Sequence, residues 1–216
     1  AWLGTKQGLE NKLFAETKIP FYPITISGIR GHGLRRLLLS PINITRAFIQ
    51  SLLIIKKWKP DVVLGMGGYV CGPAGLAAWV LRKKLVIHEQ NAVAGLTNII
   101  LVNFADTVLT GFPGVLTGVK TQYIGNPIRQ EIINIAPPGV RFASHSGAIK
   151  LLVFGGSLGA RSFNEVIPQA LALLPKSLAI EVWHQSGDKN LEIAQKNYKE
   201  RGVEAKIMPF ISDMSS

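Results

Sequence analysis

The sequence predicts an α/β fold made of two parallel-sheet units. Strand-like apolar runs alternate along the chain with helical patterns, and this alternation is typical of parallel strands joined by crossover helices. A glycine-rich turn stands between a strand and a helix in each half. Between the halves, residues 135–149 contain Ala-Pro-Pro-Gly and Ser-His-Ser-Gly, which breaks the pattern as a linker would.

The first unit is expected over residues 1–130. Residues 1–4 have the character of a strand end, so we expect the first strand and its turn to lie upstream of this chain. A helix is expected at 43–57, where Ile44, Phe48 and Ile55 share one face at helical spacing. The other expected elements are strands at 19–26, 61–65, 84–88, 106–109 and 121–124, and helices at 73–81 and 96–104.

A linker at 131–149 is expected to lead into a second unit at 150–216. Its expected strands are 150–154, 179–184 and 205–209, and its expected helices are 161–174 and 190–201. Residues 211–214, Ile-Ser-Asp-Met, are typical of a helix N-cap. Three strands are few for a doubly wound sheet, so we expect the chain to be a fragment of a longer two-domain protein with both domains incomplete.

Composition excludes several classes of protein. Apolar residues make up 47% of the 216 and charged residues 17%, which excludes intrinsic disorder. A single cysteine, Cys71, excludes a disulfide-stapled scaffold. The four isolated aspartates give no carboxylate cluster, so we expect no bound metal, and we expect no other cofactor either. The longest apolar run, 69–81, is shorter than the roughly 20 residues of a membrane span. With no signal peptide at the start, we expect a cytosolic setting.

The net charge of +11 indicates an anionic partner, which would be nucleic acid, an anionic bilayer or a phosphorylated substrate. Residues 17–60 contain eight basic residues and no acidic one. A basic rim around an apolar patch suits an anionic lipid surface, whereas an ordinary amphipathic helix would put the apolar face in the core. The amphipathic-helix explanation fits much of 43–57, whereas a lipid-facing surface is favoured for 34–42. No nucleic-acid-binding module is present, so we expect no nucleic-acid partner.

The turn at residues 65–73, Gly-Met-Gly-Gly-Tyr-Val-Cys-Gly-Pro, separates an expected buried strand from a helix. Glycines permit positive φ and let a ligand approach the backbone amides, and the helix start adds a partial positive charge. A phosphate or diphosphate would therefore fit at Gly67, Gly68 and Tyr69. A tight packing turn without any ligand explains the same residues equally well.

The second turn, residues 155–161, is Gly-Gly-Ser-Leu-Gly-Ala-Arg. Ser157 adds a hydroxyl donor beside the backbone amides. The turn matches neither the P-loop nor the full dinucleotide fingerprint. Two such turns, one in each unit, suggest two phosphate-bearing ligands that meet between the units.

Two polar groups complete the candidate site. Residues 88–91, His-Glu-Gln-Asn, end a strand, and ligands of open α/β sheets bind at such ends. Glu89 and Asn91 are candidates to orient sugar hydroxyls or to act in acid–base chemistry, whereas His88 is better explained as a packed core residue. Residues 125–129, Gly-Asn-Pro-Ile-Arg, precede the linker, where Arg129 would clamp a phosphate or be a solvated hinge charge.

These motifs, together with 94–98, Ala-Gly-Leu-Thr-Asn, and 183–187, Trp-His-Gln-Ser-Gly, run in one order through essentially the whole chain. In that order they resemble the MurG family of bacterial undecaprenyldiphospho-muramoylpentapeptide β-N-acetylglucosaminyltransferases. The resemblance implies a GT-B fold, in which two Rossmann-like domains hold the active site between them. It also implies an inverting hexosyltransferase of peptidoglycan synthesis, and thereby of cell shape and division. Such an enzyme moves N-acetylglucosamine from UDP-GlcNAc to the muramoyl C4 hydroxyl of lipid I, giving lipid II, as a peripheral protein at the cytoplasmic face of the plasma membrane.

The resemblance also assigns roles to residues of this chain. Ser157 and Arg129 would lie near the donor diphosphate, Ile211 would meet the uracil through its backbone, and Asn91 would also contact UDP-GlcNAc. The turn at Gly67, Gly68 and Tyr69 would face the acceptor diphosphate, and Glu89 would assist catalysis or only orient the acceptor. The membrane patch would comprise Leu38, Ile42, Phe48 and Trp79 with Arg35, Arg36 and Arg46.

The chain departs from the family pattern in three places. The family's opening Gly-Gly-Thr-Gly-Gly-His loop, whose histidine is a candidate general base, would precede Ala1, and later donor contacts would follow Ser216. Leu158 stands where many members have glutamine. We therefore expect the complete protein to be the enzyme and this polypeptide alone to be weakly active or inactive. The alternatives are another GT-B transferase with a lipid acceptor and a non-catalytic membrane- or protein-binding fragment.

Overall fold

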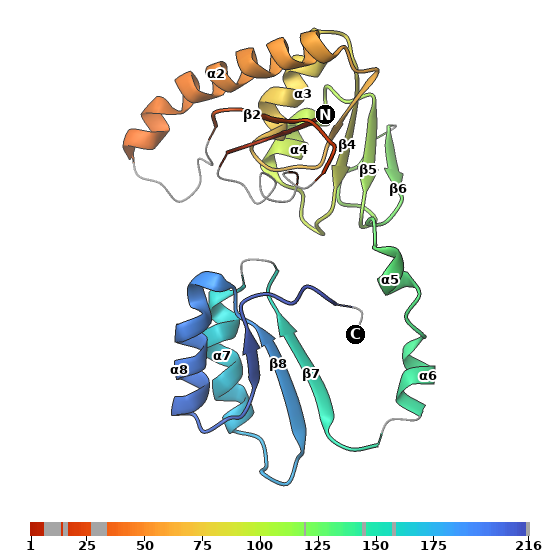
Figure 1. Cartoon of the computed structure of the whole chain (residues 1–216). Coiled ribbons are helices and arrows are strands. Elements are labelled where there is room, and N and C mark those ends of the chain that lie inside the picture. The colour runs from red at the N-terminus through yellow and green to blue at the C-terminus, as the bar shows by residue number, and fades with distance from the viewer. Residues whose placement is uncertain are drawn as a thin grey trace. The chain divides into compact units, whose positions relative to one another are not determined.

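The computed structural model describes residues 1–6, 14, 17–26, 34–118, 120–143, 146–156 and 159–214, and for residues 34–39 it describes the backbone alone. The chain divides into two compact units, Ala1–Pro127 and Ile128–Ser216, which are coloured red to green and green to blue in Figure 1. Each unit is described by itself below.

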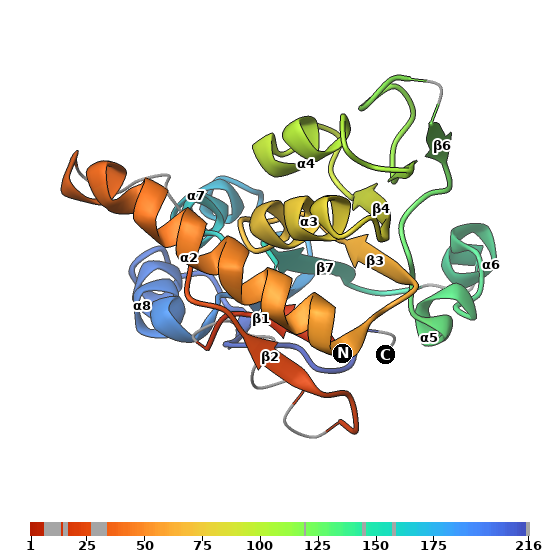
Figure 2. The same ribbon diagram turned by 90° about the horizontal axis from the view of Figure 1, so that it is seen from above.

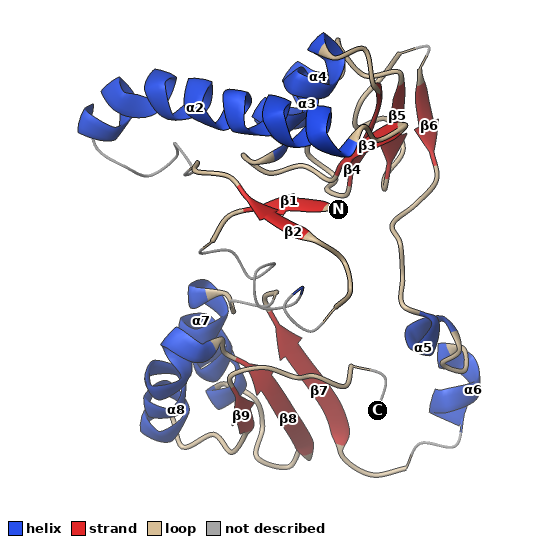
Figure 3. Cartoon of the chain, turned by 45° about the horizontal axis from the view of Figure 1, so that its top comes forward, coloured by secondary structure: helices blue, strands red, loops and turns tan. Residues whose placement is uncertain are grey.

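The first unit is built on parallel strands, as the alternating pattern predicted. A short pair joins β1 (Trp2–Gly4) to β2 (Phe21–Pro23). A separate four-stranded sheet has the order β3 (Val62–Gly65), β4 (Lys84–Glu89), β5 (Thr107–Thr110) and β6 (Thr121–Tyr123), and Figure 3 shows both sheets in red. Because β3 and β4 pair in parallel, their carboxyl ends are neighbours at one edge of the sheet.

The helices described along their whole length in the first unit are α2 (Leu34–Trp58), α3 (Cys71–Val80) and α4 (Leu96–Leu101). Helix α2 begins nine residues before the expected start at 43 and continues through Pro41. Proline has a helical φ, so it costs the helix a backbone hydrogen bond and a local distortion rather than ending it. Helices α2 and α3 run side by side (Figure 2).

The core of the first unit lies where these helices meet the sheet. Ile55 of α2, Ala77 of α3, Leu85 of β4 and Leu101 of α4 are all buried in one cluster. The alanines of α3 let that helix approach its neighbours closely, which fixes the turn that precedes it. The elements on either side of the β3–α3 turn are therefore both packed in this cluster, through Val63 and Ala77.

The second unit is a three-stranded parallel sheet in the order β7 (Ile149–Phe154), β8 (Ile180–Gln185) and β9 (Lys206–Met208). Helices α7 (Arg161–Ala172) and α8 (Leu191–Glu200) cross between the strands, with a 3₁₀ turn, η1 (Asp188–Asn190), before α8. The segment expected as a linker carries α6 (Pro138–Ala143) and most of α5 (Gln130–Ile133). Residues 211–214, where an N-cap was expected, form a loop.

A buried polar pair lies in the core of the second unit. Val153, Val182 and Tyr198 form the centre of the cluster, and the Tyr198 hydroxyl lies 2.9 Å from Nδ1 of His184 on β8. Burial lowers the pKa of His184 below its ordinary 6.5 and raises the pKa of Tyr198 to about 12. Both side chains are therefore held uncharged near neutral pH.

Candidate functional site

The first glycine turn begins where β3 ends at Gly65. Gly67 and Gly68 have φ values of 80° and 77°, a region that side chains other than glycine rarely adopt. The Cys71 amide donates to the Gly68 carbonyl at 3.2 Å and starts α3, while the Tyr69 side chain is 45% exposed. Gly67, Gly68 and Tyr69 thus lie together at an accessible turn at the carboxyl edge of the sheet, where an anionic ligand would meet backbone amides.

Glu89, the last residue of β4, is buried and accepts four hydrogen bonds. Oε1 accepts from the backbone and side-chain amides of Asn91 at 3.0 and 2.9 Å. Oε2 accepts from the Gly95 amide and from Nδ2 of Asn98, both at 2.9 Å. The carboxylate therefore fixes the loop that leads from β4 into α4, including the exposed side chain of Asn91.

These contacts decide what Glu89 can do chemically. Burial would raise its pKa, but the hydrogen bonds from Gly95, Asn91 and Asn98 outweigh burial and hold the pKa below its ordinary 4.5. A carboxylate of lowered pKa whose oxygens are already engaged is a weak proton acceptor at neutral pH. The geometry suits an orienting role for Glu89, which was one of its two expected roles.

The neighbouring residues tie the β4 end to the adjacent turns. His88 is buried as expected, with Nε2 3.0 Å from the Gly125 carbonyl and Nδ1 3.1 Å from the Gln90 amide. Because a carbonyl only accepts, Nε2 carries the proton and Nδ1 accepts from Gln90. Asn126 donates to the Gln90 carbonyl at 3.1 Å. The Gly125-Asn126 turn and the end of β4 are therefore one hydrogen-bonded group, and the part played by Gln90 was missed from the sequence.

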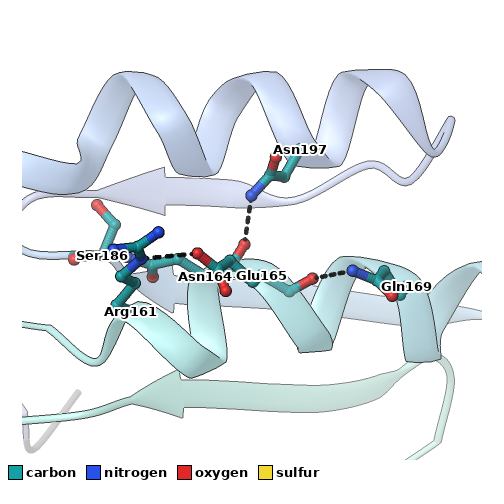
Figure 4. Close-up of polar contacts among 6 residues, drawn as sticks. All are labelled: Arg161, Asn164, Glu165, Gln169, Ser186 and Asn197. Atoms are coloured by element: carbon teal, nitrogen blue, oxygen red, sulfur yellow. Dashed lines mark hydrogen bonds and ion pairs between the residues drawn. The ribbon is translucent and has the colours of Figure 1, made fainter.

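The second glycine turn joins β7 to α7. Gly159 has a φ of 70° and lies so close to the carbonyl of Ser186 that a Cβ would overlap it. Asn164 donates to the same carbonyl at 3.1 Å and accepts at its own carbonyl from Asn197 of α8 at 2.9 Å, as the dashed lines of Figure 4 show. The turn is thereby packed against the end of β8. Ser157 and Leu158 lie outside the described residues.

Arg129 and the residues after Ile211 line one cavity within the second unit. Ile211 is buried and follows β9 by three residues. A cavity of about 340 Å³ is lined by Arg129, Glu131, Ile132, Ser212, Asp213 and Met214. Arg129 therefore lies near the segment that directly follows Ile211, although the two positions are far apart in the sequence.

The residues exposed on α2 are not all the ones expected for the membrane patch. Ile42, Ile49 and Leu53 are 66%, 50% and 64% exposed and share one face, with exposed Arg46 beside them. A groove of about 520 Å³ runs along this face. Phe48 instead packs against the core. Ile49 and Leu53 were missed, although their spacing from Ile42 is a helical signal.

Of the other residues expected in the membrane patch, Trp79 is described and three lie outside the described side chains. Trp79 is 52% exposed on α3 and packs edge-on against Phe104. The side chains of Leu38, Arg35 and Arg36 lie outside the described residues. Across the described part of the chain, no helix combines the length and apolar character needed to cross a bilayer, and no three His, Cys, Asp or Glu side chains there are grouped to hold a metal ion.

Comparison with known proteins adds independent information. The model of the glycosyltransferase family 28 N-terminal domain matches residues 1–110, and that of the family 28 C-terminal domain matches residues 150–216. Two curated relatives carry the name UDP-N-acetylglucosamine–N-acetylmuramyl-(pentapeptide) pyrophosphoryl-undecaprenol N-acetylglucosamine transferase. The relative from Marinobacter nauticus is 49% identical over 99% of this chain and 59% of its own length, and that from Paracidovorax citrulli is 46% identical over 100% and 60%. The chain thus spans about three fifths of the length of these relatives.

Solved structures agree on the fold. The crystal structure of Acinetobacter baumannii MurG matches with a TM-score of 0.65 and 35% identity, covering 100% of this chain and 58% of that one. A UDP co-structure of S. aureus MnaA matches with a TM-score of 0.52 at 15% identity, covering 91% and 62%, and this second likeness supports the fold alone. The predicted GT-B fold class is confirmed.

Proposed function

Because this chain belongs to glycosyltransferase family 28, we propose that the protein transfers N-acetylglucosamine from UDP-GlcNAc to the muramoyl C4 hydroxyl of lipid I. The product is lipid II, the precursor of peptidoglycan. The observation that carries the proposal is the 44–49% identity, over 99–100% of the chain, to relatives named for this transfer. The glycine turns at the carboxyl ends of β3 and β7 support it chemically.

The second unit supplies the donor side in this proposal. Ser157 is assigned to the diphosphate, and the start of the twelve-residue α7 offers it backbone amide hydrogens. Arg129 adds a positive charge, and the backbone of Ile211 meets the uracil. As the bond from the sugar to UDP breaks, these groups stabilise the negative charge that develops on the diphosphate.

The first unit supplies the acceptor side. The accessible turn at Gly67, Gly68 and Tyr69 faces the acceptor diphosphate. Glu89 holds Asn91 in place by two hydrogen bonds, so that the Asn91 side chain is placed to contact UDP-GlcNAc. In the reaction a base removes the proton of the acceptor hydroxyl, the oxygen attacks the anomeric carbon, and UDP leaves with inversion.

The acceptor is a lipid, so we also propose that the protein lies at the cytoplasmic face of the plasma membrane as a peripheral protein. The exposed face of Ile42, Ile49 and Leu53, with Arg46 beside it, is the contact surface. An apolar face that can enter the acyl boundary beside a basic side chain suits an anionic bilayer. The net charge of +11 adds long-range attraction to such a surface.

The test is a transfer assay with the protein expressed from its complete coding sequence. Radiolabelled UDP-GlcNAc and lipid I are supplied in anionic detergent micelles or vesicles, and lipid II is separated by chromatography. We expect labelled lipid II, with no transfer from UDP-glucose or UDP-galactose at equal concentration. Absence of labelled product, under conditions in which the Marinobacter nauticus relative is active, would overturn the proposal. Transfer from UDP-glucose at a similar rate would indicate a different transferase.

A further inference from the structure

Gln185, the last residue of β8, connects two segments that the donor site needs. Its Nε2 donates to the Gly156 carbonyl of the glycine turn at 2.8 Å, and its Oε1 accepts from the Ile211 amide, also at 2.8 Å. We propose that Gln185 is a positioning residue that sets the spacing between the diphosphate-binding turn and the uracil-binding segment. This inference rests on the proposed function and assigns a residue to which no role in donor binding had been given.

The environment of Gln185 makes it a rigid connection. The side chain is only 4% exposed, and the two residues that follow it are fixed as well. The Ser186 and Gly187 amides donate to the carbonyls of Met208 and Pro209 at 2.9 and 3.1 Å. The end of β8 thus anchors the strand that leads to Ile211, while the Gln185 side chain reaches in both directions from that anchor.

The chemistry of the two partners requires an amide side chain. A carbonyl at Gly156 needs a donor and an N–H at Ile211 needs an acceptor, and a glutamine offers one of each at neighbouring atoms. A glutamate would keep the acceptor but lose the donor, and a methionine of similar shape would lose both. Because the Ile211 amide is committed to Gln185, a nucleobase bound at this backbone would be read by the Ile211 carbonyl, which can accept from the uracil imide N–H.

The spacing matters most for a ligand that touches both segments. UDP carries a uracil and a diphosphate joined by a ribose, so it gains from having its two sites already correctly separated. Uridine and inorganic pyrophosphate each touch one segment and gain nothing from that separation. Loss of the Gln185 bridge should therefore weaken UDP selectively, whereas general damage to the fold would weaken all three ligands together.

The experiment measures binding of UDP, uridine and pyrophosphate to the complete protein by calorimetry, with NMR titration for the weaker two. For Gln185→Met we expect UDP affinity to fall about tenfold or more, while uridine and pyrophosphate change less than about threefold. Gln185→Glu should weaken UDP as well, because the Gly156 carbonyl would face a carboxylate, and it carries the test if the methionine variant does not fold. The matched control is Gln169→Met on α7, where an exposed glutamine donates one hydrogen bond to the Glu165 carbonyl at 2.9 Å, and here we expect no change for any ligand.

The outcomes separate this inference from the proposed function. If the unmodified protein binds UDP and the Gln185 variants bind it equally well, the positioning role is wrong while the donor site stands. The role is also wrong if UDP, uridine and pyrophosphate all weaken by one common factor. If the unmodified protein binds no UDP at all, the proposed donor site fails and this inference fails with it.

Discussion

Replacement of Glu89 by glutamine tests whether a charged carboxylate holds the loop between β4 and α4. Glu89→Gln keeps the shape of the side chain but removes its charge and turns one acceptor oxygen into an NH₂ group. Two of the four donors that now meet the carboxylate, for example the Gly95 amide and Nδ2 of Asn98, would then face another donor. The change therefore removes interactions without creating a cavity.

The expected magnitude follows from the burial of these groups. A hydrogen bond to a charged group contributes about 1.5–3 kcal/mol, and a buried donor left without a partner costs about 1–3 kcal/mol. Asn98 can recover only part of this. Its buried Oδ1 has no partner among the described residues and can accept from the new NH₂ group once the amide turns, but the turn breaks the hydrogen bond from Nδ2 to the His88 carbonyl. We expect a loss of about 2–4 kcal/mol in the free energy of unfolding of the first unit, or about 6–12 °C in its melting temperature.

Thermal unfolding of both proteins, followed by circular dichroism and calorimetry, measures this loss at neutral pH and in acid. The pKa of Glu89 is lowered in the folded state, so its stabilisation is present above the ordinary pKa of 4.5 and is lost as the pH falls through the folded value. The two proteins should therefore converge in stability in acid. Glu165→Gln is the control, because that exposed carboxylate pairs with Arg161 on the surface and should leave the melting temperature unchanged. A Glu89→Gln protein that melts within 1 °C of the parent at pH 7, or a difference that persists unchanged in acid, would refute the reasoning.

Three further predictions concern burial, backbone strain and the membrane surface. Burial lowers the pKa of His184, so its contribution to stability is present above the unfolded pKa of 6.5 and is lost as the pH falls below it. The free energy of unfolding measured with urea should therefore fall between pH 6.5 and 5, and His184→Gln should make this fall smaller. Gly159→Ala should cost the second unit about 3 kcal/mol or more in thermal unfolding, because the Cβ would overlap a backbone carbonyl, whereas Gly156→Ala, with positive φ but open space around it, should cost about 1–2 kcal/mol. Leu53→Glu should reduce flotation with anionic vesicles several-fold while Leu173→Glu, at a leucine of the other unit that is even more exposed (86% against 64%), should not; equal flotation of both variants would contradict the proposed surface.

The sequence was sufficient to predict the order and type of most elements, because the signals involved are local. Apolar runs predicted β3, β4, β7 and β8 within one or two residues, and a glycine-rich turn marked the end of β3 and of β7. The start of α2 was wrong, because a proline at position 41 usually suggests a helix boundary, whereas in the structure the backbone continues as a helix through it. Motifs at strand ends also located the candidate site, since parallel strands present their carboxyl ends at one edge.

Hydrogen-bond partners were decided only by the tertiary structure. The sequence shows a glutamate followed by two amides, but folding brings the Gly95 amide and Asn98 to the same carboxylate, which thereby holds the loop between β4 and α4. Gln185 contacts residues 29 and 26 positions away along the chain, and no local pattern relates those distances. The physical reason is that periodicity and turn chemistry act over a few residues, whereas a buried polar side chain takes whichever donors and acceptors the packing of separate elements leaves beside it.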